Sequence, residues 1–121
     1  MQPIFPIDGR NQSRGVRCRE GLVIGVAASK GFDTPAPPGD DIGAHAAGAF
    51  ARMDEVLAEA ALSRSDVVFV QVYLHDVLRD VDGFNAVWRD YFQGLSPARC
   101  CVGVALQGGM LVELVFTAEG A

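Results

Sequence analysis

The sequence predicts an α+β domain, with one mixed β-sheet of about five or six strands and two helices packed on one of its faces. Two observations predict this class. Apolar segments of strand length alternate with segments of helical periodicity in the order strand, strand, helix, strand, helix, strand, strand. In addition, half of the 121 residues are hydrophobic and 21% are charged, which suffices for one packed core. We therefore expect residues 1–121 to form a single domain.

The first forty residues predict two strands and a long loop. Residues 1–15 are polar and contain prolines, which predicts a loop or an edge strand. Residues 15–19 and 21–28 predict a hairpin, and the continuous apolar run of its second strand indicates burial on both faces. Residues 31–41 are rich in proline, glycine and aspartate and predict a loop. A loop of this length is either a surface connector or a lid or interface segment.

The first predicted helix covers residues 42–62, because apolar side chains recur there at helical spacing. Its stripe comprises Ile42, Ala46, Phe50, Met53, Val56, Leu57 and Ala60. Asp40 or Asp41 is expected as its N-cap, since a carboxylate accepts hydrogen bonds from the free N–H groups of the first turn. His45 lies near the edge of the stripe, and we expect it to be a structural rather than a catalytic histidine.

Residues 67–75 predict a central strand of the sheet. Both of its faces are largely apolar, which is typical of a strand covered on both sides. The strand ends at His75, beside Asp76. Neighbouring residues of a strand point to opposite faces, so this pair alone does not predict a catalytic site.

A second helix is predicted after this strand and up to residue 92. Its apolar stripe is formed by Val81, Phe84, Trp88 and Tyr91. Asp80 or Asp82 is expected as its N-cap, and Gly94 follows its end as a helix terminator.

The segment 97–114 predicts a β-hairpin with a Gly-Gly turn. Its first strand begins near Arg99, and its second strand carries Glu113 among apolar residues. An ionised carboxylate in such surroundings is costly unless a cation or water reaches it. Arg99 is the most obvious partner for Glu113, although a structural salt bridge or a subunit-interface pair would give the same pattern.

The length of the turn decides whether these two charges share a face of the sheet. A three-residue loop sets Glu113 opposite Gly103, on the face of Arg99, whereas a two-residue loop pairs Glu113 with Val104 and separates the charges. We favour the three-residue loop, in which glycine supplies a left-handed residue. Arg99 and Glu113 would then flank a cavity whose floor is formed by Cys101 and Gly103.

These residue types predict the binding and hydrolysis of a small carboxylate. The Arg99 guanidinium offers a planar fork for a carboxylate, and each charge-assisted hydrogen bond contributes about 1.5–3 kcal/mol. Glu113 is expected to position or activate a water molecule, or to pass a proton. Cys101 would supply backbone groups or a pocket wall. It is not expected to be a nucleophile, because no basic partner is evident.

The motif Pro97-Ala98-Arg99-Cys100-Cys101-Val102 precedes Leu111-Val112-Glu113-Leu114, and residues 57–63, 66–68, 72–74 and 84–92 add weaker matches. Over residues 40–118 the chain thus resembles the Rid family, the YjgF-like enamine/imine deaminases. The resemblance implies a chorismate-mutase-like homotrimer with ligand sites in clefts between subunits. It also implies hydrolysis of a reactive 2-imino or enamine carboxylate to a 2-keto acid and ammonia. No cofactor is expected. The resemblance implies that Asn85 points toward the ligand, although a solvated asparagine on the helix would give the same sequence.

The chain departs from the family pattern in its first forty residues, which match poorly, and before its last strand, where the family's Leu-Pro turn is missing. Residues 11–16 contain no tyrosine where the family has one that contacts the substrate, and residues 24–27 lack the family's pocket serine. Arg14 and Arg17 are candidates to replace them. The departures predict either a changed substrate, for example in a specialised biosynthetic pathway, or a non-catalytic trimer that binds a small carboxylate or a partner protein.

Composition argues against several other classes of protein. The net charge of −5 argues against nucleic acid as a main partner. No apolar run approaches the roughly 20 residues that cross a membrane, and residues 1–6 do not resemble a signal peptide, so a cytoplasmic protein is expected. Cys18, Cys100 and Cys101 are then expected to be thiols, and their spacing predicts no metal site.

Overall fold

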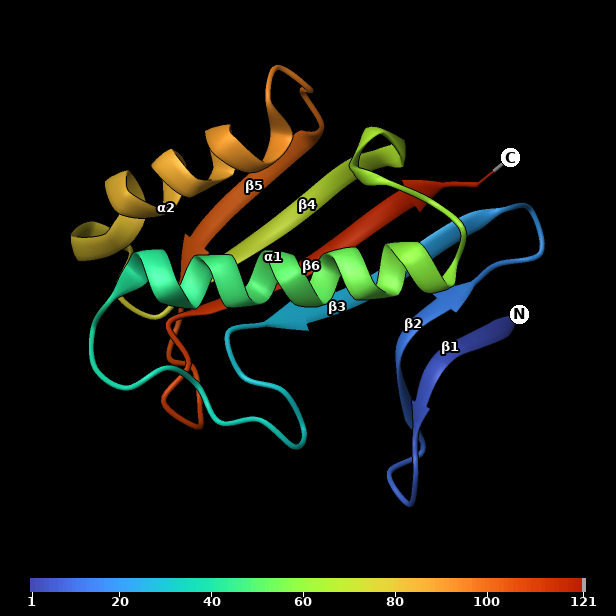
Figure 1. The fold of residues 1–121 in the computed structure, drawn as a ribbon, viewed down its shortest axis with the longest axis horizontal. Coiled ribbons are helices and arrows are strands. Elements are labelled where there is room, and N and C mark those ends of the chain that lie inside the picture. The colour runs from blue at the N-terminus through green and yellow to red at the C-terminus, as the bar shows by residue number, and fades with distance from the viewer. Residues whose placement is uncertain (121) are drawn as a thin grey trace.

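A six-stranded mixed sheet carries both helices on one of its faces (Figure 1). The computed structural model describes residues 1–120. In chain order the elements are β1 (Gln2–Ile7), β2 (Gln12–Arg17), β3 (Leu22–Ala28), α1 (Ile42–Glu59), a 3₁₀ turn (Arg64–Asp66), β4 (Val67–Leu74), α2 (Val77–Phe92), β5 (Ala98–Gly103) and β6 (Val112–Glu119). The strand order across the sheet is β1-β2-β3-β6-β4-β5. The predicted α+β class is confirmed, and β1 realises the edge-strand alternative for the first residues.

The last two strands do not form the predicted hairpin. Among residues 1–120, β5 pairs only with β4, to which it is parallel, and α2 makes the crossover between them. β6 lies between β3 and β4 and runs antiparallel to both. The segment between β5 and β6 therefore carries the chain past β4. Gly108 and Gly109 do adopt positive φ, at 66° and 75°, but they turn within a longer loop.

Both helices begin at an aspartate that caps the free N–H groups of the first turn. Asp41, one of the two predicted alternatives, caps α1. α2 begins earlier than predicted, because Asp76 accepts a hydrogen bond from the backbone N–H of Arg79. The predicted caps Asp80 and Asp82 lie inside α2 instead.

The core lies between the helices and the covered face of the sheet. An aromatic cluster joins α1 to α2, in which Phe50 stacks on Tyr91 with ring centroids 4.2 Å apart and meets Phe92 edge-on at 6.1 Å. The sheet contributes the fully buried side chains Val23, Val70, Val72, Leu74, Val112, Leu114 and Phe116. The two helical stripes therefore bury themselves against alternate residues of the strands.

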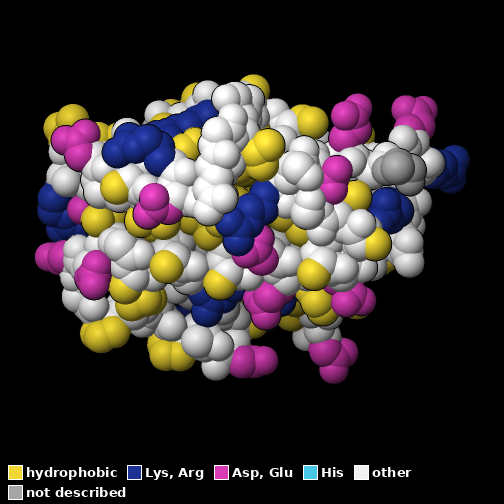
Figure 2. Space-filling view, turned by 45° about the horizontal axis from the view of Figure 1, so that its top comes forward, with side chains coloured by type: hydrophobic (Ala, Val, Ile, Leu, Met, Phe, Trp, Pro, Cys, Tyr) yellow, Lys and Arg dark blue, Asp and Glu magenta, His cyan; other side chains and the backbone are white. Residues whose placement is uncertain are grey.

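No helix covers the opposite face of the sheet within residues 1–120 (Figure 1). Leu22, Ile24 and Val26 of β3 expose 40–43% of their surface, and Val102 of β5 exposes 41%. We call this side of the sheet the open face. On the side of the molecule shown in Figure 2, acidic and basic side chains are interspersed with apolar ones.

Candidate functional site

Arg99 lies on the helix-covered face of the sheet. It stands opposite Val70 of β4, which is fully buried beneath the helices. Its Nη2 donates to Asn85 Oδ1 on α2 at 2.6 Å. Its guanidinium carbon lies 4.7 Å from the ring centroid of Trp88 and 5.5 Å from that of Phe84. β5 and α2 thus hold the half-buried guanidinium in one orientation, with aromatic faces beside it.

Glu113 lies on the open face. It stands opposite Tyr73 of β4 on one side and Ala28 of β3 on the other. Its side chain is half-buried and makes no hydrogen bond or ion pair within residues 1–120. The prediction that Arg99 and Glu113 share one face of the sheet is therefore wrong within one chain. Val70 and Tyr73 are three residues apart on β4, and an odd separation along a strand puts side chains on opposite faces.

The other predicted site residues lie with Arg99. Asn85 contacts it directly, and Cys101 stands opposite Val72 on the same face, partly buried against the core. The predicted cavity floor is absent at Gly103, because a Cβ built there would lie 2.6 Å from a methyl group of Val77. The structure therefore brings together Arg99, Asn85 and Cys101, and leaves Glu113 on the far side of the sheet.

Arg14 and Arg17 are engaged by α1 rather than by this site. Arg14 Nη2 donates to Glu55 Oε1 at 2.9 Å, and Arg17 Nη2 donates to the carbonyl oxygen of Ala60. Both arginines are on β2, and β3, β6 and β4 separate β2 from β5. Within one chain they do not join Arg99 in a second cationic contact.

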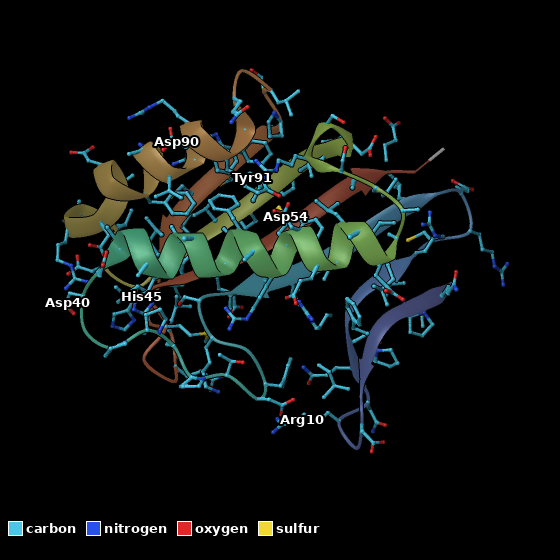
Figure 3. All side chains as sticks on the ribbon, viewed as in Figure 1. Arg10, Asp40, His45, Asp54, Asp90 and Tyr91 are labelled. Carbon is cyan, nitrogen blue, oxygen red and sulfur yellow. The ribbon has the colours of Figure 1, made fainter. Side chains whose placement is uncertain are left out.

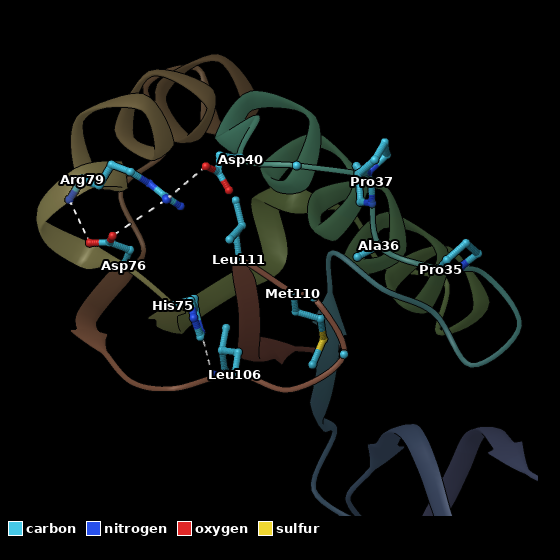
Figure 4. A pocket seen from close by; sticks show the side chains of 14 residues that line it. Pro35, Ala36, Pro37, Asp40, His75, Asp76, Arg79, Leu106, Met110 and Leu111 are labelled. Carbon is cyan, nitrogen blue, oxygen red and sulfur yellow. Dashed lines mark hydrogen bonds and ion pairs between the residues drawn. The ribbon is translucent and has the colours of Figure 1, made fainter.

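A cavity of about 780 Å³ opens at the other end of β4, and the sequence did not predict it (Figure 4). Its walls are residues 35–40, residues 106–111 without Gln107, and His75, Asp76 and Arg79. Residues 31–41, for which a lid or a connector was expected, thus line a cavity. The prolines of residues 31–41 and the pair Gly108-Gly109 in the second loop were the available signal.

Arg79 carries the main ionic network of this cavity. Its guanidinium pairs with Asp80 at 2.8 Å, with Asp40 at 3.5 Å and with Asp76 at 3.9 Å. The hydrogen bond to Asp80 raises the pKa of Arg79 further above its usual value. Arg79 therefore stays charged and joins the segment before α1 to the start of α2.

Both histidines bind backbone groups. The fully buried His45 lies between the carbonyl oxygen of Gly39 and the N–H of Leu111, which supports the expected structural role. His75 Nδ1 accepts a hydrogen bond from the N–H of Leu106 at 2.9 Å.

Metal and membrane sites receive no support from the described residues. Among residues 1–120 no group of three or more His, Cys, Asp or Glu side chains is arranged to hold a metal ion. The three cysteines are free thiols. Neither α1 nor α2 combines the length and the apolar character that crossing a bilayer requires.

The sheet with both helices on one face, and an arginine fixed at its β5 edge, define a small α+β protein of the YjgF type. A family model described as endoribonuclease L-PSP matches residues 13–120. The chain therefore belongs to this family, which is the YjgF/RutC or Rid family.

Individual relatives agree with this assignment. A RutC family protein of Aquifex aeolicus is 39% identical over 57 residues, which are 46% of this chain and 45% of that protein. The chain thus matches less than half the length of this relative. The crystal structure of the yeast protein YEO7 superimposes with a TM-score of 0.87 at 25% identity, covering 99% of this chain and 98% of the other. The Rid-family protein YyfA of Yersinia pestis gives 0.83 at 25% identity, covering 96% and 93%.

Proposed function

We propose that this chain is a cofactor-free hydrolase that converts a reactive 2-imino or enamine carboxylate to a 2-keto acid and ammonia. The observation that carries the proposal is the fixed guanidinium of Arg99. One of its N–H groups donates to Asn85 Oδ1, and the guanidinium lies over the ring of Trp88. Its remaining N–H groups are suited to a substrate carboxylate, because a guanidinium can bind both carboxylate oxygens at once.

The remaining chemistry is assigned to a carboxylate and water. An enamine first takes a proton at carbon and becomes an imine. Water then adds to the C=N carbon, the nitrogen receives a proton, and the C–N bond breaks to release ammonia and leave the carbonyl. Glu113 is proposed to hold the water and to pass the proton. Cys101, on the same face as Arg99, is proposed to form part of the pocket wall.

The site is proposed to assemble in a homotrimer. Arg99 and Glu113 lie on opposite faces of the sheet in one chain, so a pocket that uses both is built most directly from two copies. The exposed apolar side chains of the open face and the unpaired edge of β5 support such an assembly. Substrate would then bind in the clefts between subunits.

A deamination assay tests this function. A 2-imino acid generated from an amino acid by an oxidase is followed by its disappearance and by ammonia release, with and without the protein. The wild type is expected to accelerate both. Arg99→Ala removes up to two charge-assisted hydrogen bonds to substrate and is expected to lower kcat/KM by about 10²-fold or more.

The matched control is Arg89→Ala, because Arg89 is an exposed arginine in the last turn of the same helix that holds Asn85. This variant is expected to retain wild-type activity. If the wild-type protein accelerates the hydrolysis of no 2-imino acid, the enzymatic proposal fails.

A second candidate is a non-catalytic trimer that binds a small carboxylate or a partner protein. The observation in its favour is that Glu113 has no polar partner within residues 1–120 and does not face Arg99 in the same chain. This candidate predicts that a small 2-keto acid raises the melting temperature of the wild type but not of Arg99→Ala, and that no turnover occurs.

A further inference from the structure

Three side chains of α2 surround the guanidinium of Arg99. Phe84, Asn85 and Trp88 lie on one side of this helix, because residues three and four positions apart are neighbours on a helix surface. Asn85 Oδ1 accepts a hydrogen bond from Arg99 Nη2 at 2.6 Å. The ring centroids of Trp88 and Phe84 lie 4.7 Å and 5.5 Å from the guanidinium carbon. Both distances are within the roughly 6 Å over which a cation is attracted to an aromatic face.

Trp88 is the stronger of the two aromatic contacts of Arg99. It lies closer to the guanidinium than Phe84 does, and an indole attracts a cation more strongly than a phenyl ring. Phe84 is fully buried in the core, whereas Trp88 is half-buried, as Arg99 is. Trp88 therefore lies at the border between the core and the site.

The core fixes the ring of Trp88 in place. Its centroid lies 4.5 Å from that of Phe92 and 6.2 Å from that of Phe50 on α1, and both phenylalanines are buried. Because interior rings are closely packed, Trp88 cannot turn away from Arg99 without leaving a gap beside them. Packed rings thus connect α1 to the guanidinium.

No carboxylate of residues 1–120 pairs with Arg99, since the ion pairs of this part of the chain involve Arg14, Arg64 and Arg79. Asn85 and Trp88 are uncharged, so they orient the guanidinium and leave its charge available to an anionic ligand. An arginine that is already held in one orientation loses less side-chain entropy when it binds a carboxylate.

We propose that Trp88 is a positioning residue, which holds the Arg99 guanidinium in the orientation that binds the substrate carboxylate. This proposal rests on the carboxylate-binding role proposed for Arg99, and it adds that the aromatic face of Trp88 is needed for that role. The carboxylate is held in the same way before and during hydrolysis, so losing the aromatic face weakens binding rather than chemistry. If Trp88 only filled space, another apolar side chain would serve nearly as well.

The variants Trp88→Leu and Trp88→Phe separate these two roles. Leucine keeps an apolar side chain without an aromatic face, whereas phenylalanine keeps the face. Calorimetry measures the dissociation constant of pyruvate, a small 2-keto acid, and the deamination assay gives KM and kcat. Trp88→Leu is expected to raise the dissociation constant and KM together by about tenfold, with kcat changed by less than about threefold. Trp88→Phe is expected to stay within about threefold of the wild type in both constants.

Val23→Ala is the control for a general loss of stability. Val23 is fully buried on β3, and β6 and β4 separate β3 from β5. This variant is expected to unfold at a lower urea concentration, as Trp88→Leu does, but to bind pyruvate like the wild type. The proposal is overturned if Trp88→Leu keeps the wild-type dissociation constant and KM, if Trp88→Phe binds as weakly as Trp88→Leu, or if Val23→Ala weakens binding equally.

A second measurement tests the contact itself without a ligand. Trp88 is the only tryptophan of the chain, so its indole N–H gives a single NMR signal. Arg99→Ala is expected to shift this signal, because the cation over the ring is removed, and an unchanged signal would also overturn the proposal. Pyruvate binding without turnover would remove the hydrolase proposal and leave the positioning role intact, whereas a wild type that shows neither would overturn both.

Discussion

Burial and a hydrogen bond both raise the pKa of the Tyr91 phenol. Its hydroxyl donates to Asp54 Oδ1 at 2.6 Å, between α2 and α1 (Figure 3). Arg64 lies over the ring, 4.2 Å from the centroid, and also pairs with Asp54 at 3.3 Å. Burial, and then the bond to Asp54, raise the pKa of Tyr91 well above its usual value, while Arg64 opposes this in part. The phenol therefore keeps its proton in the folded protein.

This shift predicts a loss of stability in alkali. A tyrosine in the unfolded chain ionises near pH 10, whereas folded Tyr91 stays protonated, so above that pH the unfolded state binds fewer protons. The free energy of unfolding should then fall by about 1.4 kcal/mol per pH unit on account of Tyr91. Denaturant titrations between about pH 9 and pH 12 measure it.

Tyr91→Phe is the comparison for that slope. It keeps the ring stacked on Phe50 but has no proton to lose, so its stability should fall less steeply above pH 10. At neutral pH it should be less stable than the wild type by about 1.5–3 kcal/mol, because the bond to the Asp54 carboxylate is gone. Identical alkaline slopes for the two proteins would contradict the assignment.

At the scale of the elements, the packing of β3 against β6 requires a glycine at position 25, because the ring of Phe116 lies against it. A Cβ built on Gly25 of β3 would lie 2.2 Å from a ring carbon of Phe116, its partner on β6. Gly25→Ala therefore overpacks the sheet and should lower the free energy of unfolding by about 1–3 kcal/mol or more. Chemical denaturation measures this loss.

A second substitution shows whether this contact is the cause. Phe116→Leu removes ring atoms and on its own also destabilises the protein. In the double variant Gly25→Ala/Phe116→Leu the smaller side chain makes room, so the total loss should be less than the sum by about 1 kcal/mol or more. Additive losses would show that the strain at Gly25 lies elsewhere.

The sequence predicts which segments form helices and strands better than it predicts which strands pair with each other. The apolar stripes of both helices are local patterns and predict α1 and α2, and the apolar character of residues 67–75 predicts that β4 is central. The hairpin prediction failed although Gly108 and Gly109 do adopt turn conformations. Local turn chemistry does not reveal that β4 takes the place between β5 and β6, since that pairing joins segments distant in sequence.

The same distinction applies to the candidate site. Asn85 and Arg99 were both expected at the ligand, and the structure joins them directly. Glu113 was placed on the wrong face of the sheet. Arg99 pairs with Val70 and Glu113 pairs with Tyr73, and these two residues of the intervening strand β4 point to opposite faces. The hydrogen bonds of His75 with Leu106 and of His45 with Leu111 were not predicted, since both partners are backbone groups distant in sequence and no side-chain pattern marks them.

At the scale of the whole molecule, the sheet separates the two proposed catalytic side chains, and a second copy can reunite them. The open face that carries Glu113 also carries the exposed apolar residues of β3, so the same contact would bury both. In a cyclic assembly each subunit would lend its Glu113 to the Arg99 of a neighbour. This arrangement makes a prediction that does not require the substrate's exact structure.

Two inactive variants should restore activity when they are mixed. Arg99→Ala and Glu113→Gln each remove one half of every site, but a mixed trimer contains some clefts with an intact arginine from one chain and an intact glutamate from its neighbour. Random co-assembly in equal amounts should regenerate about one quarter of the wild-type rate of ammonia release. Adding Val26→Glu to both variants places a charge on the open face and should abolish the recovery by blocking assembly. Mixed trimers without activity, beside an active wild type, would mean that Arg99 and Glu113 do not meet between subunits.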